Sequence, residues 1–413
     1  MVETEVQKER VILVGVSEQD GDDTKDSLEE LKELAATAGA VTEGMVIQNR
    51  ERIHPGTYVG TGKVSEIKEM LATTGATGIV CDDELSPAQM KNLEDLLDTK
   101  VMDRTLVILD IFAAHASTSE GKIQVELAQL RYSMTRLAGF GRSMSRLGGG
   151  IGTRGPGEKK LEMDKRIIRT RISQLKRELA EVKKHREVAR GQRMRNHVPV
   201  AAIVGYTNAG KSTLLNHLTY AGVLEEDKLF ATLDPTTRQL ELPGKQQILL
   251  TDTVGFIRKL PHHLIEAFKS TLEEAKYADF IIHVVDASNP QADKQMYIVY
   301  NTLRELDIRD KKIVTLFNKM DRPEADRELR DFRADHTARI SARNDRDLET
   351  VKELLAQVLR ENKTYMEHVF SYEDAGKIQV IRRQGELLSE EYTPEGIFVK
   401  AYIPAEVYDR LGI

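Results

Sequence analysis

Apolar and polar positions alternate regularly along the first 115 residues of the chain. Short apolar runs alternate with amphipathic stretches, and this alternation is typical of an α/β domain in which helices cover a sheet. The segments that carry the pattern are 11–16, 28–38, 41–48, 64–71, 78–81 and 88–97. We therefore predict an N-terminal α/β domain over residues 1–115.

Two apolar seams follow, and each has the spacing of a helix. The first repeats at intervals of four and three residues, and the second has a similar heptad-like pattern. Their members are Ile123, Leu127, Leu130, Met134 and Leu137 in the first, and Leu161, Ile168, Ile172, Leu175, Leu179 and Val182 in the second. Because each seam needs an apolar partner, we expect an antiparallel helical hairpin over residues 116–197, with a tip loop at 139–157.

The tip loop is rich in glycine and arginine. A disordered linker would account for its glycines. A loop that becomes ordered on RNA would also account for Arg142, Arg146 and Arg154, since guanidinium groups bind phosphate and stack on bases. The arginines, carried on a two-helix arm, favour the second interpretation.

From residue 198 the pattern changes to that of a nucleotide-binding α/β unit. A buried strand at 200–204 runs into the segment GYTNAGKS (205–212), and a helix follows. This is a complete P-loop. Its glycines let backbone N–H groups point at phosphates, Lys211 adds charge beside the β- and γ-phosphates, and the Ser212 hydroxyl binds Mg²⁺.

The strand at 247–251 ends in the motif DTVG (252–255). In that position the Asp252 carboxylate can hold Mg²⁺ through water, and the Gly255 N–H can sense the γ-phosphate. The DxxG pattern alone is common in proteins. Its position after an apolar strand, and after a P-loop in chain order, makes a magnesium and γ-phosphate role a specific prediction.

Two further segments predict guanine recognition. NKMD (318–321) follows an apolar strand at 312–317, and its aspartate can accept two hydrogen bonds from the guanine edge that adenine cannot supply. SAR (341–343) follows a strand near 339–340 and suits a loop whose backbone N–H contacts the guanine O6. Together, the NKMD and SAR segments predict that the site binds GTP in preference to ATP.

The segment FATLDPTTR (230–238) lies between the P-loop and Asp252 and is expected to be a switch loop. We choose Thr232 as its magnesium ligand. Thr236 and Thr237 are alternatives that spacing does not exclude.

The predicted site residues fall into three sets. Lys211 and Gly255 are expected to act in catalysis, and Ser212, Thr232 and Asp252 to hold Mg²⁺. The residues expected to bind GTP are Gly205, Tyr206, Thr207, Asn208, Ala209, Gly210, Lys211, Ser212, Thr213, Phe230, Ala231, Thr232, Leu233, Asp234, Asp252, Thr253, Val254, Gly255, Asn318, Lys319, Met320, Asp321, Ser341, Ala342 and Arg343.

The remaining residues, 364–413, show apolar alternation around 378–380 and 397–403, which predicts strands of a small α+β domain. The whole chain is therefore predicted to be α/β. A P-loop GTPase domain (198–363) follows an α/β domain and a helical hairpin, and the small C-terminal domain comes last.

Charge is distributed unevenly along the 413 residues, whose net charge is -6. Residues 131–197 hold 19 Lys or Arg against 6 Asp or Glu. This basic segment predicts a phosphate-backbone partner, although a solvated lysine-rich helix is the plain alternative. The polar N-terminus, the single cysteine Cys81 and the absence of an apolar run of about 18 residues predict a cytoplasmic protein without a membrane role. Nothing in the sequence demands an oligomer.

The amino-acid sequences of these motifs resemble those of one family. GYTNAGKS, FATLDPTTR, DTVGF and NKMD, together with TYVGTGK (57–63) and GGGIGTRGPGE (148–158), are similar to the HflX family of translation-associated GTPases. The resemblance covers nearly the whole chain. It implies binding to the large (50S) ribosomal subunit through the arm and its tip, and a role in splitting or rescuing stalled ribosomes under stress.

Phe256 stands where many small GTPases have the glutamine that orients the attacking water. We therefore predict slow hydrolysis by the protein alone and stimulation by a ribosomal partner. Asn208 resembles an asparagine that binds potassium in related GTPases lacking this glutamine, so K⁺ acceleration is a hypothesis.

Two other functions compete with a ribosome-acting GTPase. A regulatory GTPase could switch a protein partner without contacting RNA. The first domain could also have an ATP-dependent activity of its own on RNA, prompted by the GTGK segment at 60–63, although that segment lacks P-loop spacing.

Overall fold

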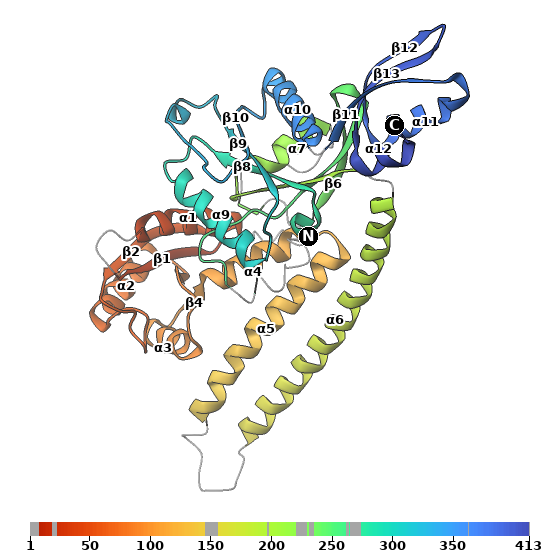
Figure 1. Cartoon of the computed structure of the whole chain (residues 1–413). Coiled ribbons are helices and arrows are strands. Elements are labelled where there is room, and N and C mark those ends of the chain that lie inside the picture. The colour runs from red at the N-terminus through yellow and green to blue at the C-terminus, as the bar shows by residue number, and fades with distance from the viewer. Residues whose placement is uncertain are drawn as a thin grey trace, which may run out of the picture. The chain divides into compact units, whose positions relative to one another are not determined.

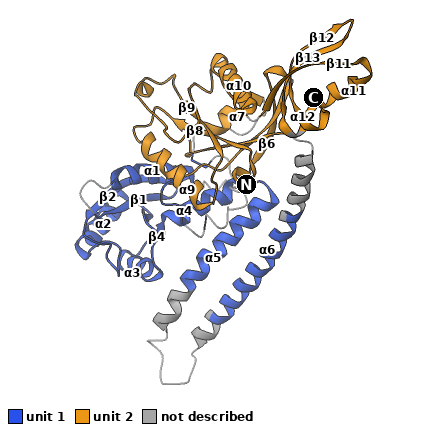
Figure 2. Cartoon of the chain, in the orientation of Figure 1, with its two compact units in different colours: residues 1–184, 227–234, 257–270 blue, residues 185–226, 235–256, 271–413 orange. Residues whose placement is uncertain are grey.

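The computed structural model describes residues 8–18, 23–144, 156–195, 198–219, 229–230, 235–261, 264, 274–361 and 363–412 (Figure 1). These residues form two compact units (Figure 2). Unit 1 comprises residues 1–184, 227–234 and 257–270, and unit 2 comprises 185–226, 235–256 and 271–413. None of the helices in the described ranges combines the length and the apolar character that crossing a membrane requires. The finer division into four domains stays a prediction.

Unit 1 is built on a four-stranded parallel sheet in the order β2-β1-β3-β4. Helices cover such a sheet on both faces, which explains why the central strand β1 is apolar along most of its length and buried. Residues of α2 and α3 share an apolar core with Ile12 and Val14 of β1, while α1 contacts α4. The elements are β1 (Arg10–Ser17), α1 (Thr24–Thr37), β2 (Val41–Asn49), α2 (Thr61–Thr74), β3 (Gly78–Cys81), α3 (Pro87–Leu97), β4 (Lys100–Asp103) and α4 (Arg104–His115).

The predicted hairpin consists of α5 (Ser119–Met144) and α6 (Pro156–Arg195), which run side by side (Figure 1). Most residues of the two predicted seams pack together around the buried Leu127, Ile172 and Leu175. The predicted loop at 139–157 was too long, because residues 139–144 continue α5 and residues 156–157 begin α6. Glycine lowers helix propensity without forbidding a helix, and the arginine and methionine beside it are good helix formers. The rest of that loop, 145–155, lies outside the described residues.

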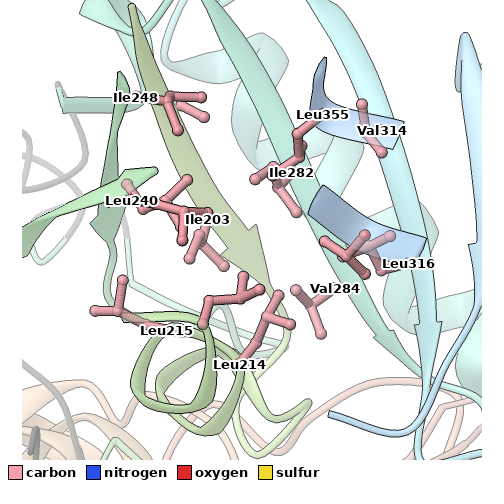
Figure 3. Packing of buried hydrophobic residues seen from close by; sticks show 14 of the residues in the cluster. Ile203, Leu214, Leu215, Leu240, Ile248, Ile282, Val284, Val314, Leu316 and Leu355 are labelled. Carbon is pink, nitrogen blue, oxygen red and sulfur yellow. The ribbon is translucent and has the colours of Figure 1, made fainter. Parts of the chain in front are cut away.

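Unit 2 contains a six-stranded sheet in the order β10-β9-β8-β5-β7-β6, parallel except for β6. Its core joins the sheet to α7 and α10, with Ile203, Leu214, Ile282 and Leu355 at the centre (Figure 3). The elements are β5 (Val200–Gly205), α7 (Lys211–Thr219), β6 (Thr236–Leu242), η1 (Pro243–Lys245), β7 (Gln246–Asp252), β8 (Phe280–Asp286), α9 (Ala292–Glu305), β9 (Lys312–Asn318), η2 (Pro323–Ala325), β10 (His336–Arg339) and α10 (Asp345–Arg360). Together with the first sheet, this arrangement confirms the predicted α/β fold class.

The C-terminal residues form a three-stranded antiparallel sheet in the order β11-β13-β12. The prediction of a strand near 378–380 is wrong, because these residues lie in helix α11. Ile378 and Ile381, three positions apart, are both buried, which is helical spacing. The elements are β11 (Lys363–Phe370), η3 (Tyr372–Asp374), α11 (Ala375–Gln384), β12 (Glu386–Thr393), β13 (Gly396–Pro404) and α12 (Ala405–Leu411).

Candidate functional site

The P-loop connects β5 to α7 at the carboxyl end of the second sheet. Two of its glycines cannot be replaced without moving their neighbours. A Cβ on Gly205 (φ +157°) would lie 2.3 Å from the Val284 carbonyl oxygen, and one on Gly210 (φ +96°) would lie 2.2 Å from the Asn318 amide nitrogen. The chain therefore needs glycine here to turn tightly, as a phosphate-cradling loop requires.

Lys211 is buried at the start of α7, and its Nζ donates a hydrogen bond to the Tyr206 carbonyl oxygen at 2.8 Å. Burial lowers the pKa of Lys211 to about 8, although Asp252 acts in the opposite direction. A buried ammonium group beside a P-loop backbone suits an anionic ligand, because phosphate would replace the water that this group has lost.

Ser212 and Asp252 lie together although 40 residues separate them. The Ser212 hydroxyl donates to Asp252 Oδ2 at 2.6 Å. Asp252 is fully buried, and its other oxygen, Oδ1, has no hydrogen-bond partner among the described residues. Burial raises the pKa of this carboxyl group against the opposing effects of Lys211 and Ser212. A hydroxyl beside a buried carboxylate oxygen without a partner is a donor set that fits Mg²⁺, a cation that prefers oxygen ligands.

The DTVG segment is tied to the P-loop by backbone hydrogen bonds. The Phe256 N–H donates to the Gly205 oxygen at 3.0 Å, and the Thr207 N–H donates to the Phe256 oxygen at 2.8 Å. A Cβ on Gly255 would lie 2.8 Å from Thr207 and 2.9 Å from Lys211 Nζ. Gly255 therefore sits directly against Thr207 and Lys211 of the P-loop, while the Phe256 ring is buried.

The two predicted guanine-binding segments lie beside each other. Ser341 Oγ donates to Asp321 Oδ1 at 2.7 Å, and this hydrogen bond is the main cause of the lowered pKa of Asp321. Asn318 accepts from the Ala342 N–H and donates to the Ala209 oxygen of the P-loop, both at 2.9 Å. The Asn318 amide thus links both guanine segments to the phosphate loop.

One residue of this region was missed from the sequence. Asp286 ends β8 and pairs with Lys319 Nζ at 2.7 Å, which holds the NKMD segment. The available signal was the apolar run Phe280–Asp286, a buried strand ending in a carboxylate.

The predicted switch loop is only partly described. Ala231, Thr232, Leu233 and Asp234 lie outside the described residues. Phe230 belongs to unit 1, where it is buried. The alternatives for Thr232 lie at the start of β6, and there the Thr237 and Thr251 hydroxyl groups are hydrogen-bonded at 2.9 Å. The other predicted residues of the site lie in unit 2.

Three protein-family models match consecutive parts of the chain. The model described as GTP-binding GTPase N-terminal matches residues 25–113, and GTP-binding GTPase Middle Region matches 115–193. The model described as 50S ribosome-binding GTPase matches residues 200–319, which contain the P-loop and DTVG segments and the first two residues of NKMD.

Curated relatives extend the match to the full chain. A GTPase HflX of Lacrimispora saccharolytica is 67% identical over 412 residues, covering 100% of this chain and 97% of the relative. A GTPase HflX of Caldanaerobacter subterraneus subsp. tengcongensis is 46% identical, covering 98% of this chain and 93% of the relative. A crystal structure of a GTP-binding protein from Sulfolobus solfataricus in complex with GDP is 25% identical, with a TM-score of 0.44, and covers 84% of this chain and 98% of that one. With a GTPase site assembled from its own motifs and relatives of this similarity, the chain is a GTP-hydrolysing member of the HflX family.

Proposed function

We propose that the protein binds the large ribosomal subunit and uses GTP to split or rescue stalled ribosomes under stress, acting in the cytoplasm as a monomer. The match of residues 200–319 to a family described as 50S ribosome-binding GTPase supports a ribosomal partner. The arm formed by α5 and α6 is the proposed contact with ribosomal RNA.

The observation that carries this proposal is a row of exposed basic residues on α6. Arg166, Arg169, Lys176 and Lys184 are exposed, and their side chains make no ion pair with any residue that the structure describes. They recur at intervals that keep them away from the buried seam of the hairpin. We call these four residues the basic stripe. Cations without a protein partner can release counterions from a phosphate backbone when they bind it.

The competing function is a regulatory GTPase that switches a protein partner. Such a partner would need an acidic surface to match the basic stripe, and naked RNA would then have no effect on turnover. The two proposals therefore differ in what stimulates GTP hydrolysis and in how that stimulation depends on salt.

The test is GTP turnover by the protein alone and with purified large subunits, small subunits or naked ribosomal RNA. We expect stimulation by large subunits that weakens at high salt. Replacing the four stripe residues with glutamine should reduce the stimulation at least tenfold. A matched variant that removes four exposed charges elsewhere, at Lys25, Arg309, Arg346 and Arg383, should keep it. Lys211→Ala controls for a contaminating GTPase. No stimulation by any of the three would favour the protein-partner switch.

Within the site, each residue has a proposed part in hydrolysis. Lys211 neutralises charge that develops on the β- and γ-phosphate oxygens, and the Gly255 N–H donates to the γ-phosphate. Ser212 would hold Mg²⁺ directly and Asp252 through water, and Thr232 is the proposed second direct protein ligand. When bound, Mg²⁺ polarises the phosphate oxygens. Asp321 and the backbone of Ala342 select guanine.

Hydrolysis by the protein alone is proposed to be slow. The Phe256 side chain has no hydrogen-bonding group and its ring is buried, so it cannot orient the attacking water. A group supplied or ordered by the ribosome would orient the attacking water in its place. Asn208 is proposed to bind K⁺, and equal turnover in potassium and sodium buffers would remove that part of the proposal.

A further inference from the structure

The chain leaves unit 2 directly after the DTVG motif. Residues 235–256 belong to unit 2, whereas residues 257–270 belong to unit 1 (Figure 2). Ile257 and Arg258 are almost completely buried, and Lys259 has a left-handed backbone conformation with φ +52°. The segment that follows the catalytic motif is thus packed within the unit built on the first sheet.

Lys259 forms two short ion pairs with consecutive carboxylates of the first domain. Its Nζ lies 2.6 Å from Asp82 Oδ2 and 2.7 Å from Asp83 Oδ1. Burial alone would lower the pKa of Lys259, but the two carboxylates outweigh burial and raise it. The ammonium group therefore stays charged, and the contact is a charged one throughout the neutral range.

Arg258 makes a second contact of the same kind. Its Nη1 lies 2.9 Å from Oδ2 of Asp23, the residue that precedes α1, and its Nε lies 3.7 Å from Oε2 of Glu30 in the middle of α1. Ion pairs of a planar guanidinium group are directional, so these contacts restrict the orientation of the segment as well as its position.

The acceptors of Lys259 lie at a distinctive point of the first sheet. Asp82 directly follows β3, which lies next to β1 in the order β2-β1-β3-β4. The order of strands reverses between β1 and β3, and open parallel sheets bind ligands at the carboxyl ends of the strands at such a point. Here the bound group is Lys259 of the same chain.

This docking point has further contacts within residues 1–115. Asp82 is fully buried and also accepts a hydrogen bond from Arg104 at 2.8 Å. Arg104 is buried in turn and pairs with Glu30. Arg258 and Lys259 therefore extend a charge network that the first sheet and α1 already hold in place.

The other candidate switch segment also contacts the first domain. Residues 227–234 belong to unit 1, and the Phe230 ring packs edge-on against Phe112 of α4 with centroids 4.7 Å apart. Both aromatic side chains are buried. Phe230 on one side of the DTVG motif and residues 257–259 on the other thus both have contacts within unit 1.

We propose that the carboxyl edge of the first sheet is the docking site for the segment that follows the DTVG motif, and that Arg258 and Lys259 are positioning residues for GTP hydrolysis. Lys259 follows Gly255 by only four positions, so fixing Lys259 restricts where the Gly255 N–H can lie. The inference rests on the proposed role of Gly255, and it does not depend on the ribosomal partner.

The test compares the full chain with Lys259→Met, which keeps the side-chain length and removes the charge. Lys259→Arg is the conservative variant. Lys276→Met is the matched control, since Lys276 has a similar exposure but pairs only loosely with the exposed Asp307 at 3.9 Å. For each protein alone, we would measure kcat and KM for GTP, the Kd for GDP, and hydrogen exchange of a peptide covering residues 252–261.

We expect Lys259→Met to exchange faster in that peptide and to lose at least threefold in kcat, with the Kd for GDP within twofold of the parent. Lys259→Arg should recover at least half of the parental kcat, and Lys276→Met should match the parent. Asp83→Asn, a change in the first domain alone, should lower kcat in the same direction.

Three outcomes would overturn the inference. Unchanged exchange and kcat in Lys259→Met would mean that the ion pairs do not hold the loop. A rise in kcat would mean that docking restrains the loop instead of positioning it. A tenfold loss of GDP affinity would mean that the substitution damages the nucleotide site itself.

Discussion

Lys211 is the residue of the nucleotide site whose lowered pKa brings its charge change close to neutral pH. Burial lowers the pKa of its ammonium group to about 8, and phosphate binds the protonated form. Above pH 8 binding must therefore be accompanied by proton uptake, and affinity should fall. We expect the Kd for GDP to rise about tenfold between pH 7 and pH 9. Lys211→Arg stays charged over this range, so a similar rise in that variant would assign the effect to the guanine base.

Asp321 offers a second prediction for a single side chain. One of its oxygens accepts from Ser341, and the carboxylate is proposed to accept two hydrogen bonds from the guanine edge. Asp321→Asn replaces an acceptor with a donor that faces the guanine amino group. We expect GTP to bind about 100-fold more weakly, as a mismatch of about 2–3 kcal/mol at the guanine edge would cause. XTP, with a carbonyl in place of that amino group, should bind the variant better than GTP does, and competition binding would measure both.

At the scale of an element, the hairpin depends on a small apolar seam. Leu175 on α6 is fully buried in it, and Leu175→Ala should cost about 2–5 kcal/mol. Because the chain forms two compact units, one unfolding free energy is not well defined, and hydrogen exchange of α5 and α6 is the better measurement. We expect at least tenfold faster exchange there. Met163→Ala, at an exposed position on the same helix, should leave exchange nearly unchanged, and equal effects of both would contradict a packed seam.

At the scale of the whole molecule, charge should determine how ribosome binding depends on salt. The basic stripe contributes four cations, and each phosphate contact adds about 0.7–0.9 to the slope of log K against log salt. Replacing the stripe with glutamine should therefore make that slope shallower by about 3. The matched variant at Lys25, Arg309, Arg346 and Arg383 should keep the parental slope. Equal slopes for the two variants would mean that total charge matters and the stripe does not.

The sequence by itself determined those features whose physics is local. A P-loop is a strand, a tight glycine turn and a helix start within about a dozen residues, and its spacing is readable without any partner. The same is true of the two seams of the hairpin, whose period of three and four residues follows from helix geometry. The errors arose where a short pattern was ambiguous. Ile378 and its neighbours fit a strand or a helix equally well, and only packing under the last sheet decided between them.

Only the tertiary structure decided which distant residues meet. Ser212 lies against Asp252, and Ser341 against Asp321, because parallel strands bring their carboxyl ends to one edge of a sheet. No period or motif marked Lys259 as the partner of Asp82, which lies 177 positions away in the chain. Such an ion pair depends on the strand order of the first sheet and on the path of the chain after Phe256. Both follow from packing and from charge complementarity between residues far apart in the sequence. A local sequence pattern contains neither.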